Sequence, residues 1–326
     1  MLLVTGGAGF IGSHFVTHWL KTTKEPVVVL DALTYAGNLK NLSEVIDNPL
    51  LHWVEGDITD SLTVNDVFER FRPRGVVHFA AESHVDRSIT DPLRFVHTNV
   101  LGTSTLLLIA QRWRDKLDND FRFINISTDE VYGSIAPEAE PSDELTPFNP
   151  SSPYSASKAS ADQLGRAFFT TYGLPVITVR CTNNYGTHQY PEKLLPFMIR
   201  QATALKPLTI YGSGLQSRDW IHVSDFVNAL MLVLEKGLPG ECYNVSARHE
   251  MTNLEFIQAL TDVLDELQPR KDGHSYRELI THVTDRPGHD MRYGLNAQKI
   301  QRELGWKPSI SFDEGFRHTI VWYLSH

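Results

Sequence analysis

The chain has 326 residues, of which 41% are hydrophobic and 21% charged, and its formal net charge at pH 7 is −9. This length is enough for one large domain, or for a large domain with a smaller one. The negative charge argues against nucleic acid as a partner, because phosphate backbones require a basic surface. The start MLLVTGG lacks a basic region, and no run approaches the roughly 20 apolar residues of a membrane span. We therefore expect a cytoplasmic protein with no membrane partner.

In chain order, the first half alternates short β-branched runs with helical segments. Strands are expected at 2–7, 26–31, 52–58, 75–81, 121–127 and 175–181, and helices at 11–19, 64–71, about 99–112 and about 155–172. Such alternation predicts parallel βαβ units, and the nearly continuous apolar runs fit strands that are covered on both faces. The expected fold is α/β: a doubly wound parallel Rossmann-type sheet.

After about residue 181 this rhythm ends. Loop residues and prolines fill NNYGTHQYPEKLLP, and LTIYGSG, RDWIHVSD and ECYNVS are separate short pieces, followed by a helical stretch at 253–267. We expect a second, smaller mixed α/β domain formed by residues 182–211 and 248–326. Residues 1–181, with returning segments at about 212–247, would form the larger domain.

Cysteine and histidine usage predicts neither a disulfide framework nor a metal site. Cys181 and Cys242 follow or lie inside apolar runs, where reduced, buried thiols are expected. The histidines show no short metal-binding spacing. Those considered are His78, His84, His188, His222 and His289.

A glycine loop follows the first expected strand. Gly6, Gly9 and Gly12 in VTGGAGFIGS allow a tight turn and let backbone N–H groups approach a pyrophosphate at a helix N-terminus. Asp31 ends the second strand, where an acid accepts hydrogen bonds from an adenosine ribose and repels a 2′-phosphate. The pattern therefore predicts NAD in preference to NADP. Asp57 either reaches the adenine or caps the next helix.

Two further groups suggest proton transfer. Tyr154 and Lys158 lie four residues apart, so in a helix they share a face, where a cationic lysine would lower the pKa of the phenol. Thr128, Asp129 and Glu130 follow one another at the end of a buried strand. The acids either serve acid–base chemistry or are a helix cap and a surface acid.

These features together resemble the extended short-chain dehydrogenase/reductase superfamily. The segments STDEVYG, AAESHVDRSI, NNYG, PEKLLP, RDW and DRPGHD resemble one branch of it, the dTDP-glucose 4,6-dehydratases. The resemblance extends from residue 2 to about residue 324. It implies an NAD-dependent hydro-lyase that oxidises C4 of the sugar, eliminates water across C5 and C6, and returns the hydride to C6.

The resemblance also implies a role for each reactive group. Tyr154 would take the C4 hydroxyl proton, and Glu130 would remove the C5 proton. Asp129, whose pKa should be raised by burial and by its acidic neighbour, would protonate the departing C6 hydroxyl. Thr128 would hydrogen-bond the C4 oxygen, and Lys158 would hold the nicotinamide ribose.

Binding residues carried over from the resemblance form two sets, and the family implies a homodimer through the helices near 99–112 and 154–172. The NAD set is Gly6, Gly9, Phe10, Ile11, Gly12, Asp31, Leu33, Thr34, Asp57, Ile58, Ala80, Ala81, Thr98, Tyr154, Lys158 and Asn184. The substrate set, in which Arg218 and Arg286 would hold phosphates, is Ser83, Thr128, Glu130, Asn183, Lys193, Leu194, Thr209, Ile210, Tyr211, Arg218, Asn253, Arg286 and His289.

Alternative functions stay open at this point. A UDP-glucose 4,6-dehydratase differs only in the nucleotide, and no residue in the sequence distinguishes thymine from uracil. A nucleotide-sugar 4-epimerase or decarboxylase would use the same scaffold, but an epimerase has no use for the acids at 129 and 130. A catalytically silent NAD-binding scaffold would not need Tyr154 and Lys158.

Overall fold

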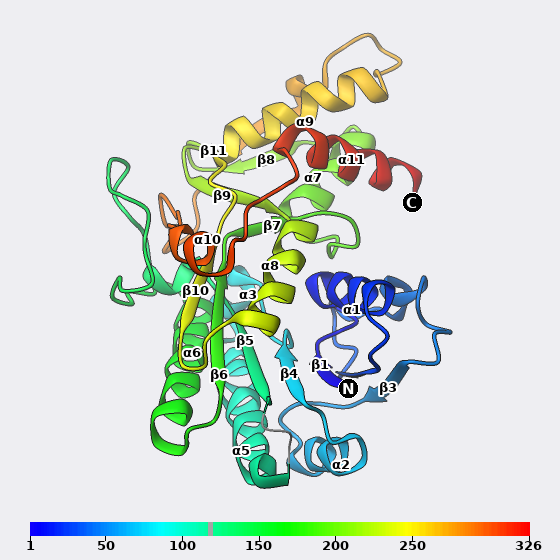
Figure 1. Ribbon diagram of the computed structural model, residues 1–326. Coiled ribbons are helices and arrows are strands. Elements are labelled where there is room, and N and C mark those ends of the chain that lie inside the picture. The colour runs from blue at the N-terminus through cyan, green and yellow to red at the C-terminus, as the bar shows by residue number, and fades with distance from the viewer. Residues whose placement is uncertain (117–119) are drawn as a thin grey trace.

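The computed structural model of the protein describes residues 1–116 and 120–326. Its centre is a seven-stranded sheet in the order β10-β6-β5-β4-β1-β2-β3, in which every neighbouring pair is parallel (Figure 1). The strands are β1 (Leu2–Thr5), β2 (Val27–Asp31), β3 (Leu51–Glu55), β4 (Gly75–His78), β5 (Arg122–Thr128), β6 (Val176–Cys181) and β10 (Cys242–Val245). The doubly wound α/β prediction is confirmed.

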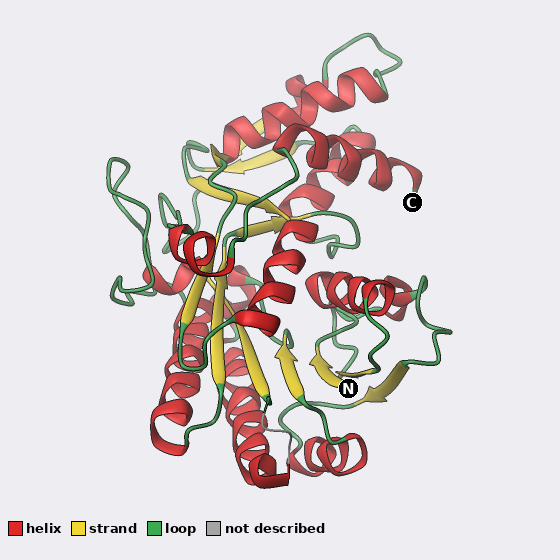
Figure 2. Cartoon of the chain, viewed as in Figure 1, coloured by secondary structure: helices red, strands yellow, loops and turns green. Residues whose placement is uncertain are grey.

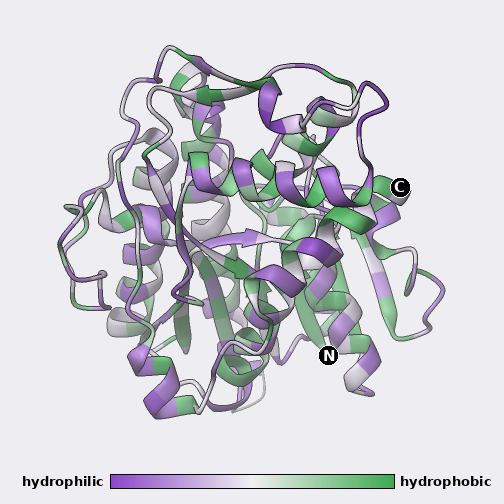
Figure 3. Ribbon diagram, turned by 90° about the horizontal axis from the view of Figure 1, so that it is seen from above, coloured by the Kyte–Doolittle hydropathy of each residue, from purple (hydrophilic) through white to green (hydrophobic). Residues whose placement is uncertain are grey.

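Helices cover both faces of this sheet because successive strand residues point to opposite sides. In β1, Leu2 and Val4 join one apolar cluster, whereas Leu3 joins another. The first cluster includes residues of α1 (Phe10–Thr22), α8 (Val223–Lys236) and α10 (Gln298–Leu304). Against the second pack α2 (Ser61–Phe71), α5 (Thr103–Trp113) and α6 (Pro153–Tyr172) (Figure 2). The resulting interior is apolar, and Figure 3 shows the central strands mainly in green.

A smaller unit lies beyond the carboxyl ends of the central strands (Figure 1). Its strands are β7 (Asn183–Tyr185), β9 (Ser217–His222) and β11 (Glu250–Thr252) in one sheet, and β8 (Leu208–Tyr211) with β12 (Ile280–Val283) in another. Helices α7 (Leu194–Thr203), α9 (Asn253–Leu267) and α11 (Phe312–Ser325) pack around them in a third apolar cluster.

The chain crosses between the two units in a way that the expected boundaries describe only in part. The segment after β9 returns to the large sheet as α8 and β10. Residues 297–306, which we assigned to the smaller domain, instead place Ile300, Leu304 and Trp306 in the first cluster of the large sheet. Their apolar side chains cover α8 and β10, and this explains the difference.

One expected helix is longer than the sequence suggested. It runs over Pro92–Lys116 and combines α4 (Pro92–Phe95), the π-helical segment η2 (Val96–Gly102), α5 and the 3₁₀ turn η3 (Arg114–Lys116). The short helix α3 (Val85–Thr90) precedes it and is separated from it by Asp91, the N-cap of α4. By length and composition alone, Pro92–Lys116 could cross a membrane, contrary to our expectation, but half of its apolar window is buried inside the protein. The core helix of a soluble protein has this property too. The other short turns are η1 (Leu39–Leu42), η4 (Asp129–Tyr132) and η5 (Tyr276–Leu279).

Candidate active site

The glycine loop lies where the strand order reverses, between the carboxyl ends of β1 and β4. Gly6 has a φ of +70°, and a Cβ placed there would lie 2.5 Å from the amide nitrogen of Ala80. A Cβ on Gly12 would clash with the carbonyl oxygen of Gly6. Gly9 precedes α1, and no side chain of the described residues caps its first amides. This cradle suits a pyrophosphate, because backbone can approach it closely and the helix dipole favours negative charge.

Replacing Gly12 with alanine should therefore remove bound NAD. The added methyl group meets the backbone of Gly6, which cannot rotate away as a flexible side chain could. We expect the purified variant to contain less than about a tenth of the wild-type NAD, measured by release from denatured protein. Gly273→Ala is the control for the general cost of replacing a glycine: its φ of +76° strains an alanine, but its Cβ meets nothing within 4 Å. This variant should keep its NAD. Full NAD content in Gly12→Ala would contradict the assignment.

Asp31 ends β2 beside this loop and is almost fully buried. Its Oδ2 accepts a hydrogen bond from the amide of Ala8 at 2.9 Å, and its Oδ1 accepts one from the amide of Leu33 at 2.9 Å. Burial raises the pKa of this carboxyl group. Each oxygen keeps a second lone pair, so Asp31 can also accept from a ribose hydroxyl.

Asp57 is exposed at the end of β3 and accepts from the amide and hydroxyl of Thr59, both at 2.8 Å. The alternative that it caps the next helix is wrong, because Asp60 is the N-cap of α2. Among the other expected NAD residues, Phe10 and Ile11 begin α1, and Ile58 is 4% exposed in the second apolar cluster. Its side chain packs against Gly102 of η2, so a contact with NAD would come from its backbone.

The acids at the end of β5 are held by a 3₁₀ turn. Thr128 is its N-cap, since its hydroxyl accepts from the amide of Glu130 at 3.3 Å. The same hydroxyl donates to Oδ1 of Asp129 at 3.1 Å, while Oδ2 of Asp129 is buried without a hydrogen-bond partner in residues 1–116 and 120–326. Asp129 is therefore not the helix cap of the alternative interpretation. A buried, unpartnered carboxylate oxygen is costly unless it is protonated.

The two neighbouring acids have different electrostatic environments. Burial, and then the charge of Glu130, raise the pKa of Asp129 to about 8. Burial also raises the pKa of Glu130, but Arg218, Arg286 and Lys193 act against that shift. Asp129 is thus protonated at neutral pH, as the sequence predicted, whereas three cations favour the charged form of Glu130. Such a separation suits one acid and one base.

Tyr154 and Lys158 are placed by the start of α6. Ser152 caps the helix in a capping box with Ser155, so Tyr154 lies in the first turn and Lys158 one turn later. The Nζ of Lys158 donates to the carbonyl oxygen of Ile126 in β5 at 2.6 Å. This hydrogen bond holds the start of α6 against β5. It places Tyr154 and Lys158 near the end of the strand that carries Thr128.

The expectation that Lys158 lowers the pKa of Tyr154 is wrong for this arrangement. Burial and then the charge of Glu130 raise the pKa of the phenol well above its usual value, and a hydrogen bond with Thr128 opposes this effect. The ammonium group of Lys158 is itself buried, and its pKa is lowered. Oxidised NAD, when bound, supplies the hydride acceptor and a positively charged ring, which would favour the phenolate.

Three predicted substrate residues bring cations toward Glu130. Lys193, the N-cap of α7, donates from Nζ to the carbonyl oxygen of Ser83 at 2.7 Å. Arg286 donates to Oδ1 of Asp86 at 2.8 Å, across 200 positions of sequence. Arg218 donates to two main-chain oxygens, those of Ser217 at 2.7 Å and Asp290 at 3.0 Å. Positive charge of this kind suits a diphosphate.

The remaining substrate residues are spread over the smaller unit. Tyr211 is 44% exposed at the end of β8, but the side chain of Ile210 is 2% exposed in the third apolar cluster. Only the backbone of Ile210 can therefore serve a ligand. The others lie as follows: Leu194 begins α7, Asn253 begins α9, Thr209 lies in β8, Asn183 lies in β7, and His289 pairs with Asp285 at 2.6 Å. Asn184, expected in the NAD set, follows Asn183 in β7.

Several residues of this region were not singled out from the sequence. Asp86 pairs with Arg286, and Glu192 pairs with Arg87 at 2.6 Å. Asp86 lies inside the motif AAESHVDRSI and Glu192 inside PEKLLP, so the motifs were the available signal. Their partners could not be inferred, because they are far away along the chain.

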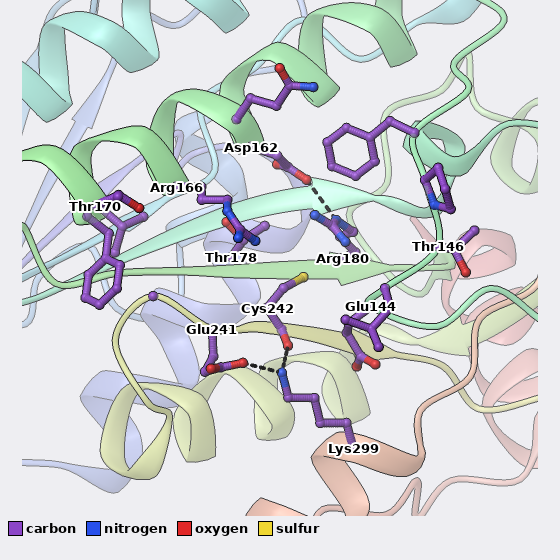
Figure 4. Close-up of a pocket in the computed structure, with 17 residues that line it drawn as sticks. Glu144, Thr146, Asp162, Arg166, Thr170, Thr178, Arg180, Glu241, Cys242 and Lys299 are labelled. Carbon is purple, nitrogen blue, oxygen red and sulfur yellow. Dashed lines mark hydrogen bonds and ion pairs between the residues drawn. The ribbon is translucent and has the colours of Figure 1, made fainter.

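The cavity in Figure 4 lies elsewhere, at the β10 edge of the sheet. It has a volume of about 650 Å³, and its lining shares no residue with the predicted sites. Arg180 pairs with Asp162 at 2.8 Å, and Lys299 donates to Glu241 at 2.6 Å and to the carbonyl oxygen of Cys242 at 2.8 Å. Oε1 of Glu144 accepts from the amide of Asn244 at 2.8 Å. These acidic and basic side chains around the cavity therefore pair with one another or with main-chain groups of β10, and these contacts stabilise the edge of the sheet.

Cys181 and Cys242 are free thiols; Cys181 is buried, as predicted, whereas Cys242 is half-buried. In the described residues, 1–116 and 120–326, no three histidine, cysteine, aspartate or glutamate side chains gather in a way that could hold a metal ion.

Known proteins resemble this chain over nearly its whole length. A family model described as GDP-mannose 4,6 dehydratase matches residues 3–319. The dTDP-glucose 4,6-dehydratase of Salmonella typhimurium is 49% identical, covering 100% of this chain and 93% of that protein. The crystal structure of DesIV, a dTDP-glucose 4,6-dehydratase from Streptomyces venezuelae with NAD bound, superposes with a TM-score of 0.92 at 44% identity, covering 100% of this chain and 97% of that one.

A UDP-glucose 4-epimerase from Thermotoga maritima is more distant. It has a TM-score of 0.88 at 29% identity, covering 99% of this chain and 98% of that one. Fold similarity therefore extends to epimerases, whereas the higher sequence identities are with dehydratases. The chain belongs to the family of NAD-dependent dTDP-glucose 4,6-dehydratases.

Proposed function

We propose that this protein converts dTDP-glucose to dTDP-4-keto-6-deoxyglucose and water. The observation that carries the proposal is the pair Asp129 and Glu130 at the end of β5, one protonated at neutral pH and the other faced by three cations. Elimination of water needs one acid and one base on neighbouring sugar carbons. An epimerase needs neither.

In this proposal each side chain handles one proton. Tyr154 takes the proton of the C4 hydroxyl, and Thr128 hydrogen-bonds the same oxygen. Glu130 removes the C5 proton, which the C4 ketone has made acidic. Asp129 gives its proton to the C6 hydroxyl, which leaves as water. The glycine loop, Asp31 and Lys158 would hold NAD, which when bound would supply a hydride acceptor for C4 and a hydride donor for C6. Glu130 would return a proton to C5 when the hydride reaches C6.

The assignment of the two units follows the same proposal. Residues 1–181, with α8 and β10, would hold NAD, and the smaller unit would hold the nucleotide. Thymine and uracil differ by one methyl group, which is worth about 1 kcal/mol in a fitted pocket. The two substrates also differ by the 2′-hydroxyl of the nucleotide ribose, which UDP-glucose carries and dTDP-glucose lacks. We expect dTDP-glucose to be preferred in kcat/KM, with the methyl group alone accounting for less than about tenfold.

Substrate labelled with deuterium at C4 tests the proposal. A dehydratase places the label at C6 of a 4-keto-6-deoxy sugar, which absorbs ultraviolet light in alkali. An epimerase yields a galactose nucleotide instead, and a silent NAD-binding scaffold yields no product. Either of these results would overturn the proposal. Repeating the assay with UDP-glucose settles the nucleotide.

We also propose a homodimer in the cytoplasm, formed through the long helical segment. Leu93, Val96, Leu101 and Leu108 are exposed by 76%, 49%, 48% and 41%, and apolar surface gathered in this way is typical of protein interfaces. The family resemblance implies a homodimer, so we propose a second copy of this chain as the partner that covers this surface.

Leu101→Glu should convert the dimer into a monomer, because it places a charge inside the apolar contact. Sedimentation equilibrium measures the mass, and retained NAD shows that the fold is intact. Leu62→Glu is the matched control, since Leu62 is 81% exposed at the start of α2, outside the long helical segment. A monomeric wild-type protein, or a dimeric Leu101→Glu, would refute the interface.

A further inference from the structure

The side chain of Arg292 joins two segments that are more than 150 positions apart in sequence. Its Nη1 donates to the carbonyl oxygens of Ala136, Pro137 and Ala139 at 3.2, 3.0 and 2.7 Å. Its Nε and Nη2 donate to the carboxylate of Glu250 at 2.7 and 2.9 Å. The side chain is only 15% exposed. A guanidinium can serve so many acceptors at once because its donors form a rigid planar fork.

The backbone reinforces this junction on the catalytic side. The amide of Ile135 donates to the carbonyl oxygen of Arg292 at 3.0 Å, and the amide of Met291 donates to the hydroxyl of Ser134 at 3.1 Å. Ser134 follows Gly133, which ends the turn that holds Asp129 and Glu130. A Cβ on Gly133 would clash with the backbone of Asn149, so this turn has little room to shift.

On its other side, the same segment leads to the cations. The amide of Ser217 donates to the carbonyl oxygen of Met291 at 2.7 Å, and Arg218 donates to that of Asp290 at 3.0 Å. Arg286 lies four residues before Asp290 in the same loop and pairs with Asp86. Arg292 therefore fastens residues 286–292 to the segment that follows the catalytic acids. Through residues 286–292, the turn after β5 is connected with Arg218 and Arg286.

Glu130 is the group that this connection affects most directly. Arg218, Arg286 and Lys193 face it with positive charge, and Asp290 faces it with negative charge. Asp129, Tyr154 and Tyr293 complete its surroundings. Coulomb energies at such sites change steeply with distance, so a small shift of the segment would change how easily Glu130 ionises.

We infer that Arg292 is a positioning residue for the reaction: by fastening residues 134–139 to residues 290–292, it fixes Glu130 relative to Arg218 and Arg286. It does not itself contact the reacting atoms. The inference rests on the proposed function, because it assigns Glu130 as base and the two arginines as diphosphate contacts. It predicts that substrate affinity and the ionisation of the base depend on a residue behind the site.

Arg292→Ala and Arg292→Lys test this role. With dTDP-glucose, KM should rise at least about tenfold in the alanine variant and less in the lysine variant, which keeps the charge but loses the fork. The acid limb of the pH profile for C5 proton exchange should move to higher pH, because the cations favour the carboxylate less. Arg302→Ala is the matched control, since Arg302 is 71% exposed on α10, and it should match the wild type.

An unchanged KM together with an unchanged acid limb would overturn the inference, even if the melting temperature falls, because the residue would then serve stability alone. Should Arg292→Ala fail to fold, Arg292→Lys and Glu250→Gln answer the same question. A wild-type protein that does not turn over dTDP-glucose would refute the proposed function. An active wild type with unaffected Arg292 variants would refute only the positioning role.

Discussion

Asp129→Asn should still form NADH from dTDP-glucose but should lose water from the sugar about 10²–10⁴-fold more slowly. The amide preserves the shape of the carboxyl group and cannot donate the proton that the C6 hydroxyl needs. Oxidation at C4 depends on Tyr154 and Thr128, which the change leaves in place. Rapid-mixing absorbance of reduced nicotinamide, alongside chemical quench of the product, separates the two steps. Equal losses in both steps would contradict the assignment.

The carboxyl group of Asp129 should also make water loss and the free energy of unfolding depend on pH. Because the pKa of Asp129 is about 8, water loss in the wild type should decline above about pH 8 as the proton is lost. Its folded-state pKa lies above the unfolded value, so the folded protein keeps a proton that the unfolded chain releases near pH 4. The free energy of unfolding contributed by this group therefore falls as pH rises from about 4 to about 8.

Asp129→Asn should lack both of these effects, and the exposed Asp66→Asn on α2 should keep them. Denaturant unfolding at pH 5 and pH 8 measures the second one. If Asp129→Asn lost stability between these values as steeply as the wild type does, the raised pKa would belong to another group.

Glu130→Gln should abolish exchange of the C5 proton with solvent and lower product formation by about 10²–10⁴-fold. Glutamine occupies the same volume but has no basic oxygen of comparable strength. NADH should still form, because this step precedes removal of the C5 proton. Incorporation of solvent deuterium at C5, followed by mass spectrometry, reports the exchange.

The exposed Glu69→Gln on α2 is the matched control and should exchange at the wild-type rate. Exchange at the wild-type rate in Glu130→Gln would remove Glu130 as the base. Loss of NADH formation in the same variant would instead place Glu130 in the oxidation step.

The regular elements could be predicted where local signals agree. Asn253–Leu267 matches the helix expected at 253–267, because its apolar period is clear and Thr252 with Glu255 forms a capping box. The helical start at 92–98 was missed, since its exposed leucine and valine and the π-helical turn break the period of an ordinary amphipathic helix. Helix α8 was not predicted, because it follows β9 without a loop: His222, the last residue of β9, is also the N-cap of α8.

The features of the site were likewise predictable from the sequence only in part. Adjacent residues with distinctive chemistry, such as Asp129 and Glu130, could be found from the sequence together with the direction of the first pKa. The pKa direction of Tyr154 could not, because burial and the charge of Glu130, which raise it, depend on how the folded chain surrounds the phenol. Contacts such as Arg286 with Asp86 arise only when distant segments fold together, so no local pattern contains them.

The interactions around the cavity of Figure 4 affect how the molecule behaves in a crowded solution. An outermost strand normally presents free amides and carbonyls, which can recruit a strand from another molecule and start fibres. On β10, Glu144 already accepts from the amide of Asn244, and Lys299 donates to the carbonyl oxygen of Cys242. Two main-chain groups on this border of the sheet are therefore already paired, which disfavours the addition of a strand from another molecule there.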